Sequence, residues 1–262
     1  MAHDATRATL TSSRTTASRK GTALPSHLPR HVVKRVLALG GLSIHRLPPI
    51  DPKKSLLVDG GARTVVDVGA NEGQYGRSIR RAGFAGPIVS FEPQSSAFAE
   101  LQRRTSRDRQ WTAHRCALGS TEGEITLNIA GNSESSSVLP MLETHTANSP
   151  TSAYVATEQV RLRRLDDVLL ETGCHGPFHL KLDVQGFELS VLEGAPDTFA
   201  AAVSLEIEMS FVPLYGGQST FDGLLDRVRS AGFDFYDVVP GFRAKNGRLL
   251  QIDGLFLRGG GG

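Results

Sequence analysis

The segment V-V-D-V-G-A-N-E-G at Val65–Gly73 constrains the fold of this chain more than any other segment. Its apolar run predicts a buried parallel strand that ends in an acid and a glycine turn, after which a helix opens. Beyond that helix, a second apolar run ends in F-E-P at Phe91–Pro93. In an open α/β sheet, ligands bind beyond the carboxyl ends of the strands, where an acid can hold ribose hydroxyls. The two segments together predict a nucleoside site.

The glycine turn departs from the dinucleotide-binding fingerprint at one position. The G-x-G-x-x-G motif uses its second glycine so that bare backbone approaches a pyrophosphate. Asn71 occupies that place here, and its side chain obstructs the approach. A cofactor with a nucleoside and no phosphate fits better, which favours S-adenosylmethionine and a methyltransferase. A nicotinamide-dependent oxidoreductase and a non-catalytic nucleoside-binding protein are the alternatives.

Apolar runs bounded by turn residues predict the main strands, and helical patterns fall between several of them. The predicted strands are Thr64–Val68, Ile88–Glu92, Trp111–Ala117, Phe178–Asp183, Ala202–Glu208, Phe233–Val239 and Ile252–Leu257, and the predicted helices are Tyr75–Ala82, Ser95–Arg107, Phe187–Leu192 and Thr220–Ser230. Alternating strands and helices predict an α/β fold with a doubly wound, mostly parallel sheet. The last two strands are joined by a turn-rich link without a helical pattern, so the last strand is expected to be antiparallel.

We expect residues 61–258 to form one domain with an insertion at 119–176. The insertion contains two segments that alternate like strands, Glu124–Ile129 and Gln159–Leu165, separated by a polar stretch at Gly131–Pro150. A loop this long inside a compact domain is usually functional or disordered. We interpret it as a lid on the substrate side.

The charge is distributed unevenly along the chain. Residues 1–50 carry eight Lys/Arg and one acid, so the overall net charge of +2 leaves −5 on the remainder. Since a nucleic-acid substrate usually needs a basic face, this class of partner is not expected. Residues 1–30 are expected to be a disordered basic tail, with an organelle transit peptide as the alternative. Residues 31–60 are expected to be a helical extension, and 259–262 a flexible glycine tail.

The expected location is the cytoplasm. Two cysteines, Cys116 and Cys174, are too few for a disulfide framework. No apolar run approaches the length of a membrane-spanning helix. The helical extension either braces the domain or touches an anionic membrane surface, so a peripheral membrane location is the alternative. The sequence does not indicate the oligomeric state.

Several motifs occur together in the order typical of one family. They are V-D-V-G-A-N-E-G-Q-Y (Val66–Tyr75), F-E-P (Phe91–Pro93), A-L-G (Ala117–Gly119), S-S-S (Ser135–Ser137), R-L-D-D-V-L (Arg164–Leu169), L-K-L-D-V-Q-G-F-E-L-S-V-L-E-G-A (Leu180–Ala195) and L-E-I-E. In these motifs the chain resembles the FkbM-like family of S-adenosylmethionine-dependent methyltransferases. The resemblance implies a class I methyltransferase fold and O-methylation of a hydroxyl on a sugar, a glycolipid or another natural-product scaffold.

The candidate cofactor residues lie at the ends of the first three strands. Asp67 is expected to order the glycine loop and to accept a hydrogen bond from the methionine amino group, directly or through water. Glu92 is expected to accept from both ribose hydroxyls. The other candidates are Gly69 and Gly73, which leave room for the cofactor, Ala70, Asn71, Pro93, and Ala117 with Leu118 at the adenine edge. Asn71 is also a candidate helix cap.

The candidate chemistry residues lie at the ends of later strands. Asp183 ends the fourth strand and is either a general base or a ligand for Mg²⁺, with helix capping as its structural alternative. Glu206 and Glu208 alternate with apolar residues, so they share one face of the fifth strand. Glu208 is paired with Asp183 as the second catalytic candidate, and Glu206 is expected to bind the acceptor.

The candidate acceptor-binding residues in loops are Ser136 in the serine run and Tyr215 in P-L-Y-G-G. Tyr215 forms one wall of the acceptor pocket or packs on the surface. His145 in the lid is a weaker candidate, which either swings into the site as a base or is a solvated loop residue.

Overall fold

The computed structural model describes residues 55–57 and 60–259. The predicted basic tail at 1–30 lies outside these residues, as do most of the predicted helical extension at 31–60 and of the glycine tail at 259–262.

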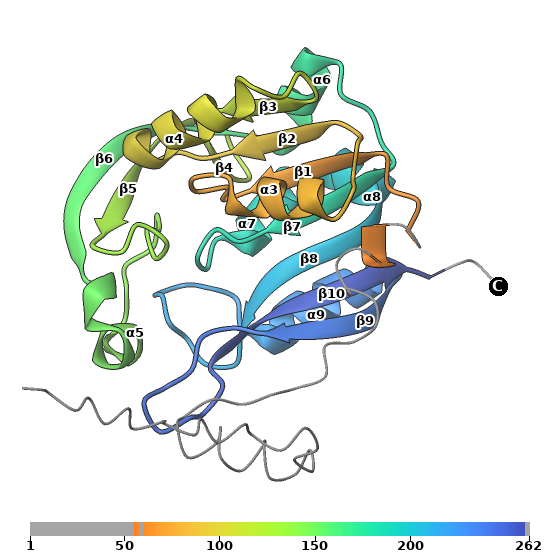
Figure 1. The fold of residues 1–262 in the computed structure, drawn as a ribbon. Coiled ribbons are helices and arrows are strands. Elements are labelled where there is room, and N and C mark those ends of the chain that lie inside the picture. Colours follow the sequence, from red (N-terminus) through yellow and green to blue (C-terminus); the bar gives the residue numbers. More distant parts are fainter. Residues whose placement is uncertain (1–54, 58–59, 260–262) are drawn as a thin grey trace, which may run out of the picture. The chain divides into compact units, whose positions relative to one another are not determined.

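A seven-stranded sheet carries the site, with the strand order β3-β2-β1-β7-β8-β10-β9 (Figure 1). The strands are β1 (Thr64–Val68), β2 (Ile88–Phe91), β3 (Trp111–His114), β7 (Phe178–Leu182), β8 (Ala202–Ser210), β9 (Phe233–Pro240) and β10 (Gln251–Arg258). β3, β2, β1, β7 and β8 pair in parallel, whereas β10 is antiparallel to both β8 and β9. The predicted fold class, including the antiparallel last strand, is confirmed.

Helices connect the parallel strands. They are α3 (Gln74–Arg81), α4 (Ser95–Thr105), α6 (Leu165–Thr172), α7 (Glu188–Glu193), α8 (Pro196–Ala201) and α9 (Phe221–Ser230). The sequence predicted α3, α4, α7 and α9 to within two residues at each end but not α6 and α8. Every residue of β1 and of β7 is buried, as expected for central strands that are covered on both faces.

The predicted third strand, Trp111–Ala117, is wrong in its second half. The chain leaves the main sheet after His114, and β4 (Ala117–Leu118) joins a separate three-stranded sheet in the order β4-β6-β5. The side chains of Cys116, Ala117 and Leu118 are all buried, so the chain buries apolar residues again after it changes sheet. No Gly, Pro, Asn or Asp marks the break in the sequence, so the pattern of turn residues could not locate it.

Much of the insertion is ordered by regular structure. β5 (Gly123–Ala130) and β6 (Tyr154–Arg163) pair antiparallel, and α5 (Glu143–Asn148) lies between them in the sequence, followed by a short 3₁₀ helix at Pro150–Ser152. Backbone bridges connect Asn128 with Ser137 and Met141 with Tyr215. The polar stretch predicted to be a long loop is thus attached both to its own sheet and to the segment after β8.

The ends of β1 and β7 approach each other closely at Gly69. This glycine has φ +75°, and a Cβ atom placed on it would lie 1.8 Å from the carbonyl oxygen of Asp183. Only a residue without a side chain fits there. Gly69 therefore brings Asp67 and Asp183, the acids at the ends of the two strands, to the same edge of the sheet.

Candidate functional site

A cavity of about 620 Å³ opens at the carboxyl ends of β1, β2, β7 and β8, a size typical of small-molecule sites. The predicted site residues that line it are Gly69, Ala70, Asn71, Glu92, Pro93, Ala117, Leu118, Ser136, Asp183, Glu206 and Glu208. Three predicted site residues, Asp67, Gly73 and Tyr215, are not among its lining residues. The structure thus brings together residues from the strand ends and from the insertion.

Glu92 is held in place by backbone amides. Its Oε2 accepts a hydrogen bond from the Asn71 amide and its Oε1 accepts one from the Gln94 amide, both at 2.8 Å. Each carboxylate oxygen has two lone pairs, so each retains one for a ligand. Burial raises the pKa of Glu92 to about 7 even though the two amides oppose the shift. The arrangement presents a pair of acceptors to the cavity.

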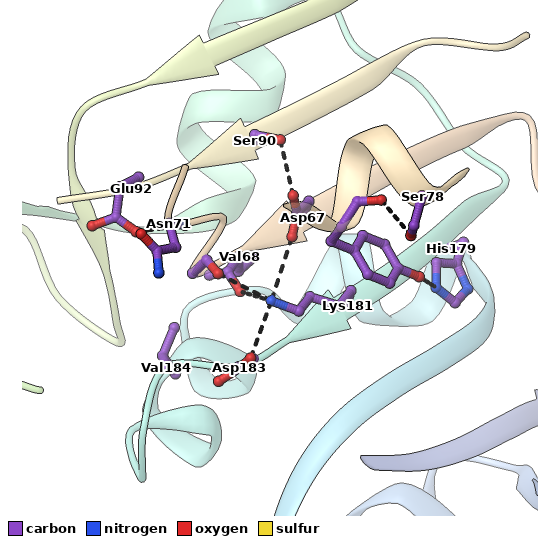
Figure 2. Close-up of polar contacts among 12 residues, drawn as sticks. Asp67, Val68, Asn71, Ser78, Ser90, Glu92, His179, Lys181, Asp183 and Val184 are labelled. Atoms are coloured by element: carbon purple, nitrogen blue, oxygen red, sulfur yellow. Dashed lines mark hydrogen bonds and ion pairs between the residues drawn. The ribbon is translucent and has the colours of Figure 1, made fainter. Parts of the chain in front are cut away.

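Asn71 places a second acceptor beside Glu92 (Figure 2). Its side-chain Oδ1 is buried and has no hydrogen-bond partner among the described residues. The residue has φ 47°, a conformation that asparagine tolerates better than most side chains. It does not cap α3, as the sequence suggested, because the N-cap residue is Gly73 and no side chain caps this helix.

Lys181 is a functional candidate that the sequence analysis missed. It lies on β7, and its Nζ reaches between two acids, at 3.5 Å from Asp67 Oδ1 and 3.4 Å from Asp183 Oδ2 (Figure 2). It also donates a hydrogen bond of 3.0 Å to the carbonyl oxygen of Gly69. Burial alone would lower the pKa of Lys181, but nearby carboxylates, chiefly those of Asp183 and Asp67, raise it above its usual value. Lys181 therefore stays charged and links the glycine loop to β7.

Asp67 lies behind the cavity wall. Its side chain is 0% exposed, and its Oδ2 accepts a hydrogen bond from Ser90 while its Oδ1 faces Lys181. Burial raises its pKa, and Lys181 opposes the shift. The expected direct contact with a methionine amino group is not supported by this position. Asp67 orders the loop through Lys181.

Gly73 does not line the cavity either. A Cβ atom on it would lie 2.9 Å from the Leu101 side chain and 3.2 Å from the Trp111 ring, and its φ is +85°. The absent side chain thus makes room for the packing of α3 on α4 and β3, and the expectation that Gly73 leaves room for a cofactor is not supported.

Gln185 is the second residue that the sequence analysis missed. Its Nε2 donates to Asp183 Oδ1 at 2.9 Å and to both carboxylate oxygens of Glu208 at 3.0 and 2.9 Å. Burial raises the pKa of Glu208, and the neighbouring Asp183 and Glu188 raise it further. The amide of Gln185 therefore joins the two acids that the sequence nominated for catalysis.

Tyr215 supports Gln185 from behind. It is fully buried, and its hydroxyl donates to Gln185 Oε1 at 2.6 Å. The expected wall of the acceptor pocket is therefore formed by Gln185 rather than by Tyr215. No sequence pattern indicated this, because the two residues lie 30 positions apart.

The described residues contain no group of three or more His, Cys, Asp or Glu side chains that could hold a metal ion. The space between Asp183 and Glu208 is bridged by the amide nitrogen of Gln185, which is a donor and not a metal ligand. The magnesium alternative for Asp183 therefore has no support.

The insertion contributes hydroxyl and amide groups to the cavity wall. Ser136 Oγ donates to Gln94 Oε1 and accepts from the Ala130 amide, each at 3.1 Å. His145 on α5 also lines the cavity and is 4% exposed. It is therefore not the solvated loop residue that the sequence alternative described.

The comparison with protein families decides the class. A family model described as the methyltransferase FkbM domain matches residues 67–235. The chain belongs to this FkbM methyltransferase family. It is an S-adenosylmethionine-dependent methyltransferase, and the nicotinamide-dependent and non-catalytic alternatives are set aside.

Two curated relatives of this FkbM methyltransferase are methyltransferases by name. The 2-O-methyltransferase NoeI of Sinorhizobium fredii is 23% identical over 172 residues, which cover 63% of this chain and 71% of NoeI. Methyltransferase 1 of Beauveria bassiana is 28% identical over 145 residues, which cover 51% of this chain and 58% of that protein.

Solved structures similar to the FkbM methyltransferase include a TehB-like S-adenosylmethionine-dependent methyltransferase from Corynebacterium glutamicum, with 11% identity, a TM-score of 0.36, and coverage of 87% of this chain and 96% of the other. An rRNA methylase from Streptococcus thermophilus has 11% identity, a TM-score of 0.44, and coverage of 82% of this chain and 99% of the other.

No helix in the described ranges is long and apolar enough to cross a membrane.

Proposed function

We propose that this enzyme transfers a methyl group from S-adenosylmethionine to a hydroxyl of a sugar, a glycolipid or a related natural-product scaffold. The observation that carries the proposal is that the wall of one cavity includes both the nucleoside-type acceptors at Asn71 and Glu92 and the carboxylates at Asp183 and Glu208. A donor and an acceptor molecule would therefore meet in the same cavity.

The residues at the end of β1 and β2 fit the cofactor. The Glu92 carboxylate keeps one lone pair on each oxygen after accepting from the two backbone amides, which suits the two neighbouring hydroxyls of a ribose. The Oδ1 of Asn71 has no partner in the described part of the chain, and it suits a donor such as an amino group. Ala117 and Leu118 are buried and apolar, and they would line one edge of the adenine ring.

The other end of the cavity would hold the acceptor. S-adenosylmethionine supplies an electrophilic methyl group when it is bound, so much of the protein's work is positioning. Asp183 and Glu208, joined by Gln185, would accept hydrogen bonds from acceptor hydroxyls and orient the reacting oxygen. Glu206 and Ser136 line the same cavity and would bind further polar groups of the acceptor.

The relative NoeI is named for 2-O-methylation, which makes such a hydroxyl the first acceptor to test. A cavity wall rich in carboxylate, amide and hydroxyl groups favours an acceptor with several hydroxyls over an apolar one. The cytoplasmic location and a peripheral contact with membranes remain proposals.

The test begins with calorimetric titration of S-adenosylmethionine into the purified protein and into the Glu92→Ala variant. We expect micromolar binding that weakens by about 100-fold or more in the variant, because two charge-assisted hydrogen bonds of about 1.5–3 kcal/mol each are lost. Glu124→Ala is the matched control, since Glu124 is exposed on β5. Equal binding by all three proteins would contradict the assignment of Glu92.

Methyl transfer is then measured with a methyl-labelled donor and a panel of acceptors. The panel contains methyl glycosides, their 2-deoxy analogues and a glycolipid, with an amino sugar added to detect N-methylation. We expect product from the glycosides and less from the 2-deoxy analogues. Donor binding without transfer to any hydroxyl would leave the cofactor assignment intact and overturn the proposed acceptor class.

A further inference from the structure

His145 is a cavity residue for which the strand-end motifs provide no role. It lies on α5, in the insertion, and lines the same cavity as Asp183 and Glu208 although it is only 4% exposed. Its ring packs edge-on against Tyr215, with ring centroids 5.2 Å apart, and lies 5.1 Å from the ring of Phe242, which is itself a cavity residue. The two aromatic contacts fix the orientation of the imidazole.

Neither ring nitrogen of His145 makes a hydrogen bond within the described part of the chain, and Nδ1 is fully enclosed. Buried polar side chains in native proteins nearly always have a partner, so an exception requires an explanation. A structural histidine of this protein shows the contrast. His179 is bonded through Nε2 to Tyr75 and through Nδ1 to Ser204, each at 2.8 Å. Unlike His179, His145 has no ring hydrogen bond within the described residues that would explain it as a structural histidine, and its side chain lines the cavity.

A cluster of hydroxyl and amide groups from the insertion, which also carries His145, lines the same cavity. Asn132 Nδ2 donates to the hydroxyls of Ser135 and Ser152 at 3.0 and 3.1 Å, and Ser152 Oγ donates to Ser149 Oγ at 2.8 Å. All four line the cavity. The insertion therefore offers the cavity neutral hydrogen-bonding groups, which suit a polyhydroxylated molecule.

We propose that His145 is the general base that removes the proton from the acceptor hydroxyl during methyl transfer. The inference rests on the proposed function, O-methylation, and adds to it the residue that handles the proton. Nε2 is the proton-accepting atom, because Nδ1 is enclosed by protein.

The step balances in atoms and charge. The O–H bond of the acceptor breaks and its proton moves to Nε2, while the oxygen forms a bond to the methyl carbon. The carbon–sulfur bond of the donor breaks and its electron pair stays on sulfur, which becomes a neutral thioether. The positive charge thus passes from the sulfonium to the imidazolium, and the proton later leaves to solvent.

The protonation state of the ring agrees with this role. Burial lowers the pKa of His145, so the imidazole is neutral at pH 7 and ready to accept a proton. Tyr215 is the titratable group in ring contact with it, and burial raises the pKa of Tyr215, so the phenol stays neutral over the same range. Phe242, the other ring in contact with His145, carries no charge.

Asp183 and Glu208, the two carboxylates that the sequence nominated for catalysis, are less available as bases. Asp183 has one oxygen beside Lys181 and accepts from Gln185 with the other. Both oxygens of Glu208 accept from Gln185. The carboxylates of Asp183 and Glu208 are suited to orienting the acceptor, whereas the ring of His145 is free to take a proton.

The test compares His145→Gln and His145→Ala with the wild type, on the glycoside that the wild type methylates. We expect kcat to fall about 100-fold or more in His145→Gln, which is the usual contribution of a general base. The dissociation constant for S-adenosylmethionine should change by less than about threefold, because His145 serves the proton transfer and not donor binding. Added imidazole should restore part of the activity of His145→Ala. His175→Gln is the matched control, since His175 is exposed and is not among the cavity residues.

A measurement that does not depend on activity completes the test. In ¹⁵N-histidine-labelled wild-type protein, the His145 imidazole, assigned through its backbone resonances, should be neutral at pH 7. Its signals should shift when methyl glycoside is added in the presence of S-adenosylhomocysteine. An imidazolium at pH 7, or signals that glycoside leaves unchanged, would overturn the proposal.

The outcomes separate this inference from the proposed function. If the wild type methylates a hydroxyl and His145→Gln keeps more than about one third of kcat, only the role of His145 is wrong. Loss of donor binding in His145→Gln would show a structural role and would also overturn it. If the wild type methylates no hydroxyl, the proposed acceptor class and this inference fall together.

Discussion

The two ends of the cavity are held together in different ways. At the end of β1 and β2, backbone amides fix Glu92, and one of them belongs to a residue only two positions away. At the end of β7 and β8, side chains from distant segments meet around Gln185. The Tyr215 hydroxyl, for instance, is bonded both to Gln185 and to the carbonyl oxygen of Ser135, 80 positions earlier.

This difference has a functional consequence. A site made from local backbone keeps its geometry when side chains elsewhere change, which suits a cofactor that is the same for every member of a family. A site made from side chains on several segments changes with each substitution, which suits an acceptor that varies. Mutations should therefore affect the two ends separately.

The largest effect is expected at Lys181, which connects the two ends. Lys181→Met leaves the buried carboxylate of Asp67 without its charged neighbour, so we expect the free energy of unfolding to fall by about 3–5 kcal/mol. Urea denaturation measures this loss. The double variant Lys181→Met/Asp67→Asn should recover a large part of it, because the unpaired buried charge is then removed. A single variant as stable as the wild type would show that Lys181 does not support the glycine loop.

The affinity for the cofactor is predicted to depend on pH through Glu92, at the end of the cavity formed by β1 and β2 (the cofactor end). The pKa of this side chain is raised to about 7, so it is protonated below pH 7 and accepts fewer hydrogen bonds from a ribose. The affinity for S-adenosylmethionine should therefore rise with pH up to about 7, by as much as tenfold per unit, and then level off. Calorimetry between pH 5.5 and 8.5 checks this, and an affinity independent of pH would contradict the assigned protonation.

The raised pKa of Glu92 also makes the stability of the folded protein depend on pH, in the opposite direction to the cofactor affinity. Because the folded-state pKa of Glu92 is raised from 4.5 to about 7, its contribution to stability is fully present below about pH 4.5. That contribution is lost as the pH rises through about 7. The free protein should therefore lose stability in the range in which cofactor affinity increases, and thermal denaturation with and without cofactor separates the two effects.

At the end of the cavity formed by β7 and β8 (the acceptor end), a change at Gln185 is predicted to lower the rate of methyl transfer without changing cofactor binding. Gln185→Met removes the amide that joins Asp183 and Glu208 and leaves two acids facing each other. We expect kcat to fall by about tenfold, a positioning loss of about 1.4 kcal/mol. The cofactor dissociation constant should stay within about twofold. Gln159→Met is the matched control, because Gln159 lies on β6 and its hydrogen bond to Thr126 is exposed. A parallel loss of cofactor affinity would mean that the two ends are not independent.

The sequence predicted the cofactor end better than the acceptor end, for a physical reason. β1 and β2 are apolar runs followed by a glycine turn and an acid, and each of these signals is local. β7 was also predicted, but Lys181 within it was overlooked. A lysine inside an otherwise apolar central strand is a signal in itself, because buried lysines are rare unless they are paired. Gln185 gave no such signal, since a neutral polar residue in a turn is ordinary.

The fold was predictable where the pattern was long and periodic. The positions of most strands along the chain and the antiparallel β10 followed from apolar runs and from the turn-rich link before the last strand. The change of sheet at Arg115–Cys116 was not predictable, because no Gly, Pro, Asn or Asp marks it in the sequence. The contacts that order the insertion, such as the bridge from Met141 to Tyr215, join positions far apart, and no local pattern records them.

The smallest effect is expected for Tyr215→Phe, which removes one hydroxyl from the fully buried ring behind Gln185. The loss of its hydrogen bond to Gln185 Oε1 should lower the free energy of unfolding by about 1 kcal/mol, with a larger loss if Oε1 is left without a partner. If Tyr215 supports Gln185 and does not touch the acceptor, KM for the acceptor should stay within about twofold while kcat falls by a few-fold. A large rise in KM with unchanged kcat would instead place the Tyr215 hydroxyl in contact with the acceptor, and would restore the role that the sequence suggested for it.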